Sequence, residues 1–163
     1  MNVSNNEKKE AFTNADKYLQ FSLGSEDYAI PLLMVKEVIP TPDTVPIPNS
    51  PDYYVGVMNL RGQIISIVDL RKKLKISPNT DNSEVAVMIV NHHDFNIGLV
   101  VDKIQKVLPI EPSEVSEVPD IQSKINSQYI QGVHQSMEDL TILVDLEKLL
   151  DFNKLRETAL KAS

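Results

Sequence analysis

The side chains that could support catalysis are few and scattered in this sequence. There are three histidines, at positions 92, 93 and 134, and no cysteine. A hydrolase that uses a nucleophile needs a histidine base within reach of it, and none of the three lies in a recognisable catalytic elbow or loop. The lack of cysteine also excludes disulfides, thiolate catalysis and cysteine-bound metal.

Two other groupings could do chemistry in principle. His92, His93 and Asp94 are adjacent in the turn of an expected hairpin, but neighbouring side chains on a strand point to opposite faces, so we expect no shared metal ion. Glu114 and Glu117 have the residue type of a glycosidase pair, yet they stand in a polar, proline-containing loop without an aromatic platform. The five single glycines form neither a phosphate-binding loop nor a dinucleotide fingerprint. By elimination we predict a binding protein, not an enzyme, with no metal and no cofactor.

Composition narrows the class of partner. The chain has 163 residues, 42% of them hydrophobic, and a net charge of -7, so it can bury a substantial core but repels polyanions. We therefore expect no nucleic acid partner. The N-terminus lacks the apolar segment of a signal peptide, and no apolar run approaches the roughly 18 residues of a membrane helix. We predict a cytoplasmic protein without direct membrane insertion.

Hydrophobic alternation predicts many short strands. Residues 1–16 are polar and aperiodic, which favours a flexible tail, and from Tyr18 Leu19, Phe21 and Leu23 fall on one face. "VAVMIV" and "FNIGLVV" repeat this two-strand pattern, while "LLMVKEVIP" fits a helical turn or a strand. The leucine spacing of "LEKLLDFNKLRETALKAS" predicts an amphipathic C-terminal helix. A barrel or sandwich is therefore favoured over a helical bundle.

The chain also repeats itself. At an offset of 76 residues, the following positions match their counterparts from Tyr129 to Leu150: Tyr53, Gly56, Val57, Val68, Asp69, Leu70, Lys72 and Leu74. We predict one domain over 17–150, made of two related β-subdomains of approximately 17–80 and 81–150 that exchange strands, followed by a helix or tail at 151–163. Asp69 and its counterpart Asp145 are expected to cap short helices.

One turn carries a conspicuous charge. In "NLRG" the glycine, Gly62, permits a positive φ, so Asn59 to Gly62 is expected to form a tight turn between two strands. The second copy has "HQSMED" at this place, without arginine or glycine. Arg61 is either a solvated charge or an ion-pair partner of Glu37, or it contacts a partner protein; an arginine held by Glu37 could do both.

These residues resemble a known family. "GVMNLRGQIISIVDLRKKL", with "YAIPLLMVKEVI" before it and "IGLVVDKIQKVL" and "ILVDLEKLL" after it, resembles the CheW family of chemotaxis coupling proteins from about Tyr18 to Leu150. The resemblance implies an all-β fold with short helices: two intertwined five-stranded SH3-like β-barrels that share a core, plus a C-terminal helix. It further implies a non-catalytic adaptor that joins the cytoplasmic tips of methyl-accepting chemotaxis receptors to the regulatory domain of the histidine kinase CheA, in arrays beneath the inner membrane.

Carried over to this sequence, the resemblance places a receptor-binding groove between the barrels. Its residues would be Val35, Val38, Ile39, Arg61, Val87 and Val107. An apolar groove suits a helical hairpin, although each valine fits core packing equally well. Kinase contacts are expected on the second barrel, at residues that the sequence does not identify. Ser66 replaces the family's usual proline, so this strand regains a backbone donor, and we expect a change in the local edge geometry and in kinase affinity but not in the fold.

Two alternatives stay open. One is a CheW-like scaffold that serves a non-flagellar signalling system, and the other is a small-ligand-binding β-barrel.

Overall fold

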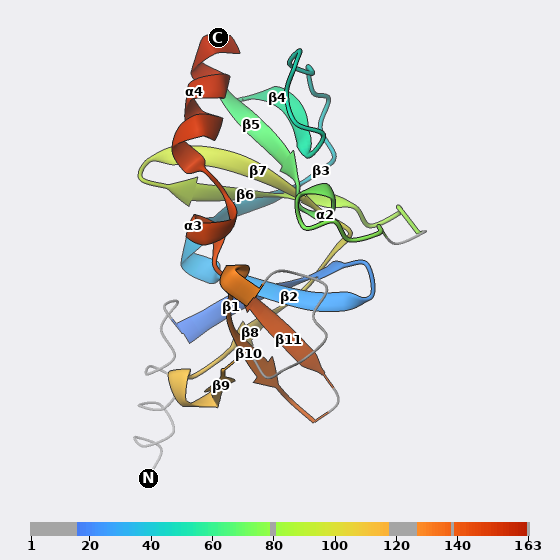
Figure 1. The fold of residues 1–163 in the computed structure, drawn as a ribbon, viewed down its shortest axis with the longest axis vertical. Coiled ribbons are helices and arrows are strands. Elements are labelled where there is room, and N and C mark those ends of the chain that lie inside the picture. Colours follow the sequence, from blue (N-terminus) through green and yellow to red (C-terminus); the bar gives the residue numbers. More distant parts are fainter. Residues whose placement is uncertain (1–15, 79–80, 118–126, 138, 163) are drawn as a thin grey trace.

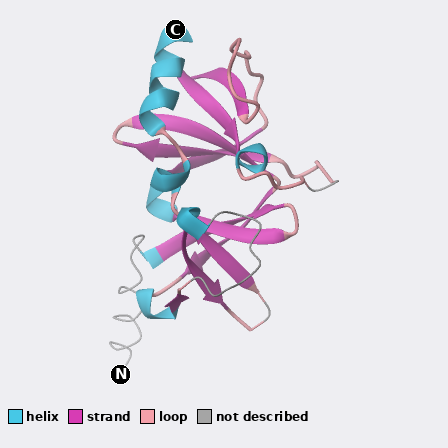
Figure 2. Ribbon diagram, in the orientation of Figure 1, coloured by secondary structure: helices cyan, strands magenta, loops and turns pink. Residues whose placement is uncertain are grey.

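Two β-sheets and several short helices make up the fold (Figures 1 and 2). The computed structural model describes residues 16–78, 81–117, 127–137 and 139–162, so the expected tail at 1–16 lies almost entirely outside the described residues. Among them, the six-stranded sheet consists of β1 (Lys17–Leu23), β2 (Glu26–Pro31), β8 (Lys103–Pro109), β9 (Val115–Ser116), β10 (Ile130–Gln135) and β11 (Leu140–Val144). The five-stranded sheet consists of β3 (Val35–Pro40), β4 (Tyr54–Leu60), β5 (Gln63–Asp69), β6 (Ala86–His92) and β7 (Phe95–Val101).

The helical elements are short except for the last. They are the 3-10 turns η2 (Leu32–Met34), η3 (Pro112–Glu114) and η4 (Ser127–Tyr129), and the helices α2 (Leu70–Lys73), α3 (Leu146–Leu149) and α4 (Phe152–Ala162). The ambiguous segment "LLMVKEVIP" is therefore a 3-10 turn followed by a strand.

Each sheet includes a hairpin that comes from the other half of the chain. The strand order is β8-β1-β2-β11-β10-β9 in one sheet and β3-β6-β7-β5-β4 in the other. The hairpin β1–β2 thus lies between strands of the second half, and β6–β7 lies between strands of the first half. In each case the inserted hairpin makes one parallel pairing, β2 with β11 and β7 with β5. This confirms the predicted fold class, two intertwined β-barrels with short helices.

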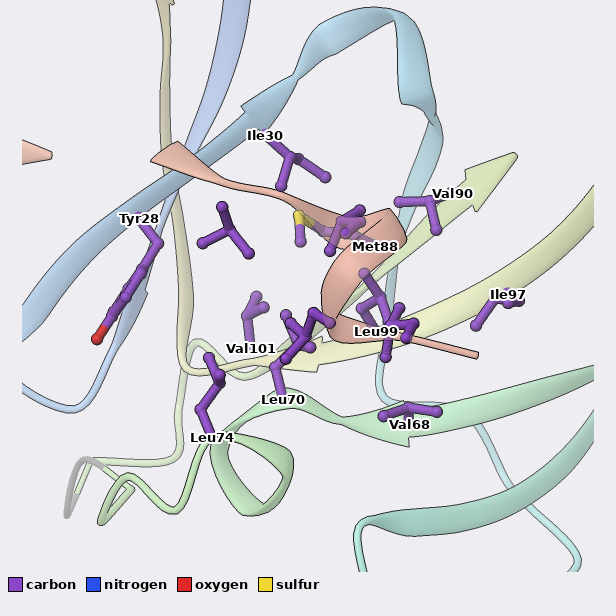
Figure 3. Packing of buried hydrophobic residues seen from close by; sticks show 14 of the residues in the cluster. Tyr28, Ile30, Val68, Leu70, Leu74, Met88, Val90, Ile97, Leu99 and Val101 are labelled. Atoms are coloured by element: carbon purple, nitrogen blue, oxygen red, sulfur yellow. The ribbon is translucent and has the colours of Figure 1, made fainter. Parts of the chain in front are cut away.

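The barrels share a hydrophobic core. The largest cluster joins buried residues of both sheets with those of α2, α3 and α4. Tyr28 and Ile30 of β2 belong to the same cluster as Met88 of β6 and Leu99 of β7, and Figure 3 shows Ile30 beside Met88. A second cluster lines the inside of the five-stranded sheet, and a third lines the inside of the six-stranded sheet. Since burying one large apolar side chain contributes about 1.5–3 kcal/mol, the shared cluster ties the stability of one barrel to the other.

The C-terminal segment differs from the single helix that its leucine spacing predicts. The structure has two helices, because Leu150 is extended, with φ -116° and ψ 139°. The carboxylate of Asp151 then accepts a hydrogen bond from the Lys154 amide at 3.1 Å, which starts α4 anew. The break lets α4 pack its buried face, Phe152, Leu155 and Ala159, against the shared core.

Ser66 does not lie at a sheet edge as expected. β5 pairs with β4 on one side and β7 on the other, so the strand is central and the expected change of edge geometry is wrong. Its buried hydroxyl instead donates a hydrogen bond to the Leu155 carbonyl of α4 at 2.7 Å.

In the part of the chain that the structure describes, no helix has the length and apolar character needed to cross a membrane.

Candidate functional site

The turn between β4 and β5 adopts a left-handed backbone at two successive residues. Arg61 has φ 50° and Gly62 has φ 87°, which is the backbone of a type I′ hairpin turn. Leu60 and Gln63 pair on either side of it, and the side-chain oxygen of Asn59 accepts a hydrogen bond from the Gly62 amide at 2.8 Å. A positive φ is unfavourable for arginine, so the turn displays this side chain at a conformational cost.

Arg61 forms an ion pair with Glu37. Its Nη1 donates to Glu37 Oε2 at 3.0 Å, and the two side chains are 71% and 25% exposed. Glu37 lies on β3 and Arg61 follows β4, the two edge strands of the five-stranded sheet. The pair therefore joins the edges of that barrel. Because the Arg61 side of the pair is exposed to solvent, the pair contributes at most about 1 kcal/mol.

The other oxygen of Glu37, Oε1, is buried and lacks a hydrogen-bond partner among the described residues. Glu37 thus has one carboxylate oxygen inside the barrel, while the other holds the Arg61 guanidinium at the barrel surface. An exposed arginine that is fixed by a half-buried acid is preorganised for a further contact, since a guanidinium carries five N–H donors.

The three predicted residues of β3 do not share one face. Burial alternates along the strand, so Val35 and Ile39 face inward and Val38 faces out, where it is 42% exposed. Val35 packs against the shared core and Ile39 against the second cluster. Opposite Ile39 lies Val87 of β6, which has no exposed surface. Ile39 and Val87 therefore support the strand from within.

The last predicted valine lies on the other barrel. Val107 is 46% exposed and stands on β8, an edge strand of the six-stranded sheet, opposite Leu19. β8 holds the same place in its sheet as β3 does in the other. Leu33 in η2, just before β3, is 65% exposed and was not identified from the sequence. Its only signal was an apolar run, "LLM", which does not distinguish an inward from an outward leucine.

The two expected capping residues stand at the starts of short helices. Asp69 accepts hydrogen bonds from the amides of Arg71 and Lys72, and Asp145 accepts one from Lys148. Sequence reasoning missed what else Asp69 does. Arg71 bridges two carboxylates, that of Asp69 at 2.9 Å and that of Asp102 at 2.9 Å, and hydrogen bonds to these acids raise its pKa. The network stiffens the junction at the end of β5.

Comparison with known proteins agrees with this architecture. The family model described as "CheW-like domain" matches residues 17–154. The chain is similar to the chemotaxis protein CheW of Klebsiella aerogenes, with 33% identity over 143 residues, covering 88% of this chain and 86% of that protein. It is also similar to the chemotaxis protein CheW of Treponema pallidum, with 32% identity over 143 residues, covering 85% of this chain and 84% of the relative.

A solved structure shows the same fold. The crystal structure of the scaffolding protein TtCheW from Thermoanaerobacter tengcongensis superposes with a TM-score of 0.76 at 28% identity, over 84% of this chain and 88% of that one. Sequence and fold agree, so the chain belongs to the CheW-like domain family.

Proposed function

We propose that this protein couples chemotaxis receptors to the kinase CheA through the edge strands of its two barrels. As a member of the CheW family it is a non-catalytic adaptor of chemotaxis signalling. The single observation that carries the proposal is the match of the CheW-like domain over residues 17–154 on a twin-barrel fold. We further propose that it acts in the cytoplasm, at receptor arrays, and the membership of the CheW family supports this.

The receptor surface that we propose combines exposed apolar side chains with one fixed arginine. Leu33, Val38 and Val107 are exposed on or beside β3 and β8, and Arg61 stands at the edge of the first barrel. A receptor tip that presents an amphipathic helical hairpin would bury these side chains. Arg61 would then donate to a carboxylate or to helix-end carbonyls. In this proposal Val35, Ile39 and Val87 form the wall that supports the surface.

The kinase surface is proposed on the second barrel. The hairpin β10–β11 carries two exposed apolar residues, Met137, which is fully exposed, and Leu140, which is 39% exposed. They lie on a different sheet from Arg61 and Val38, and in their own sheet β1 and β2 separate them from β8, which carries Val107. In this proposal the two surfaces are therefore far enough apart for both partners to bind at once. Simultaneous binding is what an adaptor needs, since linked weak contacts then strengthen each other through effective concentration. A receptor change can in this way shift the kinase between active and inactive populations.

The filled interior of the five-stranded sheet argues against the alternative function, a small-ligand-binding β-barrel. Ile65, Ile67, Val87 and Ile89 have no exposed surface and fill the inside of the five-stranded sheet. A barrel that holds a ligand keeps its interior open. The alternative of a non-flagellar signalling system keeps the same surfaces and changes only the partners.

The experiment compares binding to a receptor cytoplasmic fragment and, separately, to CheA. Arg61→Ala removes the charge, and Arg61→Asn removes it while placing at the turn a residue that tolerates a positive φ. Arg156→Ala on α4 is the matched arginine control. We expect both Arg61 variants to lose receptor binding by about 2 kcal/mol, as a hot-spot arginine does, and to keep CheA binding. The control should bind both.

Thermal midpoints separate the outcomes. If the Arg61 variants unfold more easily and lose both partners, Arg61 is a brace of the fold and the proposed receptor contact is wrong. If the wild-type protein binds neither partner, coupling to these receptors and to CheA is refuted and the non-flagellar system takes its place.

A further inference from the structure

The turn between β6 and β7 and the start of α3 bring together two imidazoles and a carboxylate. Among the described residues, the ligand atoms of His92, His93 and Glu147 all lie within 4.8 Å of one another. His92 Nε2 lies 3.0 Å from Glu147 Oε1. We propose that these three side chains form a binding site for a divalent transition-metal ion, with Zn²⁺ as the ion that the ligand set fits best.

The backbone explains why adjacent histidines share one side, which strand alternation argues against. β6 ends at His92, and the next two residues, His93 and Asp94, adopt left-handed conformations with φ 48° and φ 63°. The strand geometry therefore no longer applies at His93. Its ring turns back to meet that of His92 edge to face, with centroids 4.1 Å apart and an interplanar angle of 84°.

The first imidazole is held in place before any metal binds. The ring of His92 stacks on Phe152 of α4, with centroids 4.2 Å apart and planes 11° from parallel. Phe152 is itself buried in the shared core. Glu147 stands in the first turn of α3, which Asp145 caps. The stacking on Phe152 and the capping of α3 fix the orientation of His92 and Glu147, as the neighbours of metal ligands do in known metal sites.

All three ligand-atom separations are at most 4.8 Å, and that of His92 and Glu147 is close to a tetrahedral spacing. Two ligands that are each about 2.1 Å from one Zn²⁺ lie roughly 3.4 Å apart, so His92 and Glu147, now 3.0 Å apart, need move little. Two imidazoles and one carboxylate are a ligand set that Zn²⁺ accepts with water in the fourth position. Mg²⁺ and Ca²⁺ prefer all-oxygen sites.

The surroundings leave room for that water. The three ligands line an open cavity of about 650 Å³ together with Lys73, Lys148 and others. The two lysines oppose a cation, but the ammonium of Lys73 lies 4.3 Å from the centre of the Tyr53 ring and is engaged there.

A metal at this place would connect the two barrels. The histidines close the β6–β7 hairpin of the five-stranded sheet, whereas α3 follows β11 of the six-stranded sheet. An ion bound by both the β6–β7 hairpin and α3 would link the two barrels at the point where the C-terminal segment passes from one to the other. The unfolded chain does not hold the three ligands together, so the ion binds mainly to the folded protein. It should therefore stabilise the fold. This inference does not depend on the proposed function.

The test is titration of the full-length, tag-free protein with ZnCl₂, followed by calorimetry and by NMR of the histidine rings. The chain has only three histidines, so each imidazole can be followed separately. We expect one Zn²⁺ per chain, a raised thermal midpoint, and shifts of His92 and His93 resonances with His134 unmoved. Mg²⁺ should produce none of these effects.

Matched variants decide whether the three residues are the ligands. His93→Ala and Glu147→Gln should each weaken Zn²⁺ binding by at least about tenfold, while Glu157→Gln on α4 and His134→Gln should bind as wild type does. Both ligand side chains are exposed, so metal-free variants should keep the wild-type midpoint, which shows that they fold. Equal Zn²⁺ binding by all variants, or no binding by wild type, would overturn the proposal.

Discussion

Tyr28 is the largest side chain that is completely buried in the described part of the molecule, and it makes stability depend on alkaline pH. Its hydroxyl donates to Glu26 Oε2 at 2.7 Å. Burial, followed by the hydrogen bond and the charge of Glu26, raises the pKa of the phenol well above its ordinary value of 10.0. Burial likewise raises the pKa of Tyr54, against a smaller opposing effect of Ser66.

The sign of the effect follows from linkage. A raised pKa in the folded state contributes stability below the unfolded pKa and loses it as pH rises above about 10. We expect the thermal midpoint to fall as the pH rises from about 10 upward, and to fall less steeply in Tyr28→Phe. Tyr18→Phe, at a half-buried tyrosine, is the control and should follow wild type. Parallel pH profiles for wild type and Tyr28→Phe would contradict this account.

At the scale of elements, one buried hydroxyl attaches the C-terminal helix to the first barrel. Ser66 Oγ donates to the Leu155 carbonyl at 2.7 Å and lies 2.7 Å from the Tyr54 hydroxyl. Ser66→Ala removes both hydrogen bonds and leaves buried polar groups without their partner, which costs about 1–3 kcal/mol.

Hydrogen exchange should show where that cost falls. We expect the amides of α4 to exchange faster in Ser66→Ala, while those of β10 and β11 change less. Ser116→Ala, which removes an exposed hydroxyl on β9, should leave exchange and midpoint unchanged. A loss of protection spread evenly over both sheets would show that Ser66 supports the whole core and not the helix.

Hydrophobic periodicity and the internal repeat predict most of the fold but less of the candidate site. The alternation at Leu19, Phe21 and Leu23 predicts strands because side-chain direction follows a period of two, and these residues are buried. The same pattern does not tell an inner valine from an outer one on an edge strand, so Val38 and Val87 received the same role although one is exposed and the other buried.

Contacts across the chain were harder still to predict. Arg71 and Asp102 are 31 residues apart, and only the exchange of hairpins brings them together. The sequence predicts a hairpin turn at His92 to Asp94 but not its left-handed backbone at His93 and Asp94, because histidine and aspartate are only more frequent at a positive φ and do not require it.

At the scale of the whole molecule, Asp102 joins the two barrels where the chain crosses between them. It stands between β7 and β8 and is 2% exposed. One carboxylate oxygen accepts from the Gly24 amide in the β1–β2 turn at 2.6 Å, and the other accepts from Arg71, beyond β5, at 2.9 Å. The six-stranded and five-stranded sheets thus meet at one side chain.

Asp102→Asn keeps the shape and removes the charge. We expect a loss of roughly 2 kcal/mol, less than for a fully isolated buried pair because Arg71 keeps Asp69 as partner. For a chain of this size that lowers the thermal midpoint by about 4–8 °C. Since the barrels share a core, scanning calorimetry should still show one transition. Asp43→Asn, at an exposed acid, should leave the midpoint in place. Two separate transitions in the variant would mean that each barrel is stable alone and that Asp102, more than the shared core, makes them unfold together.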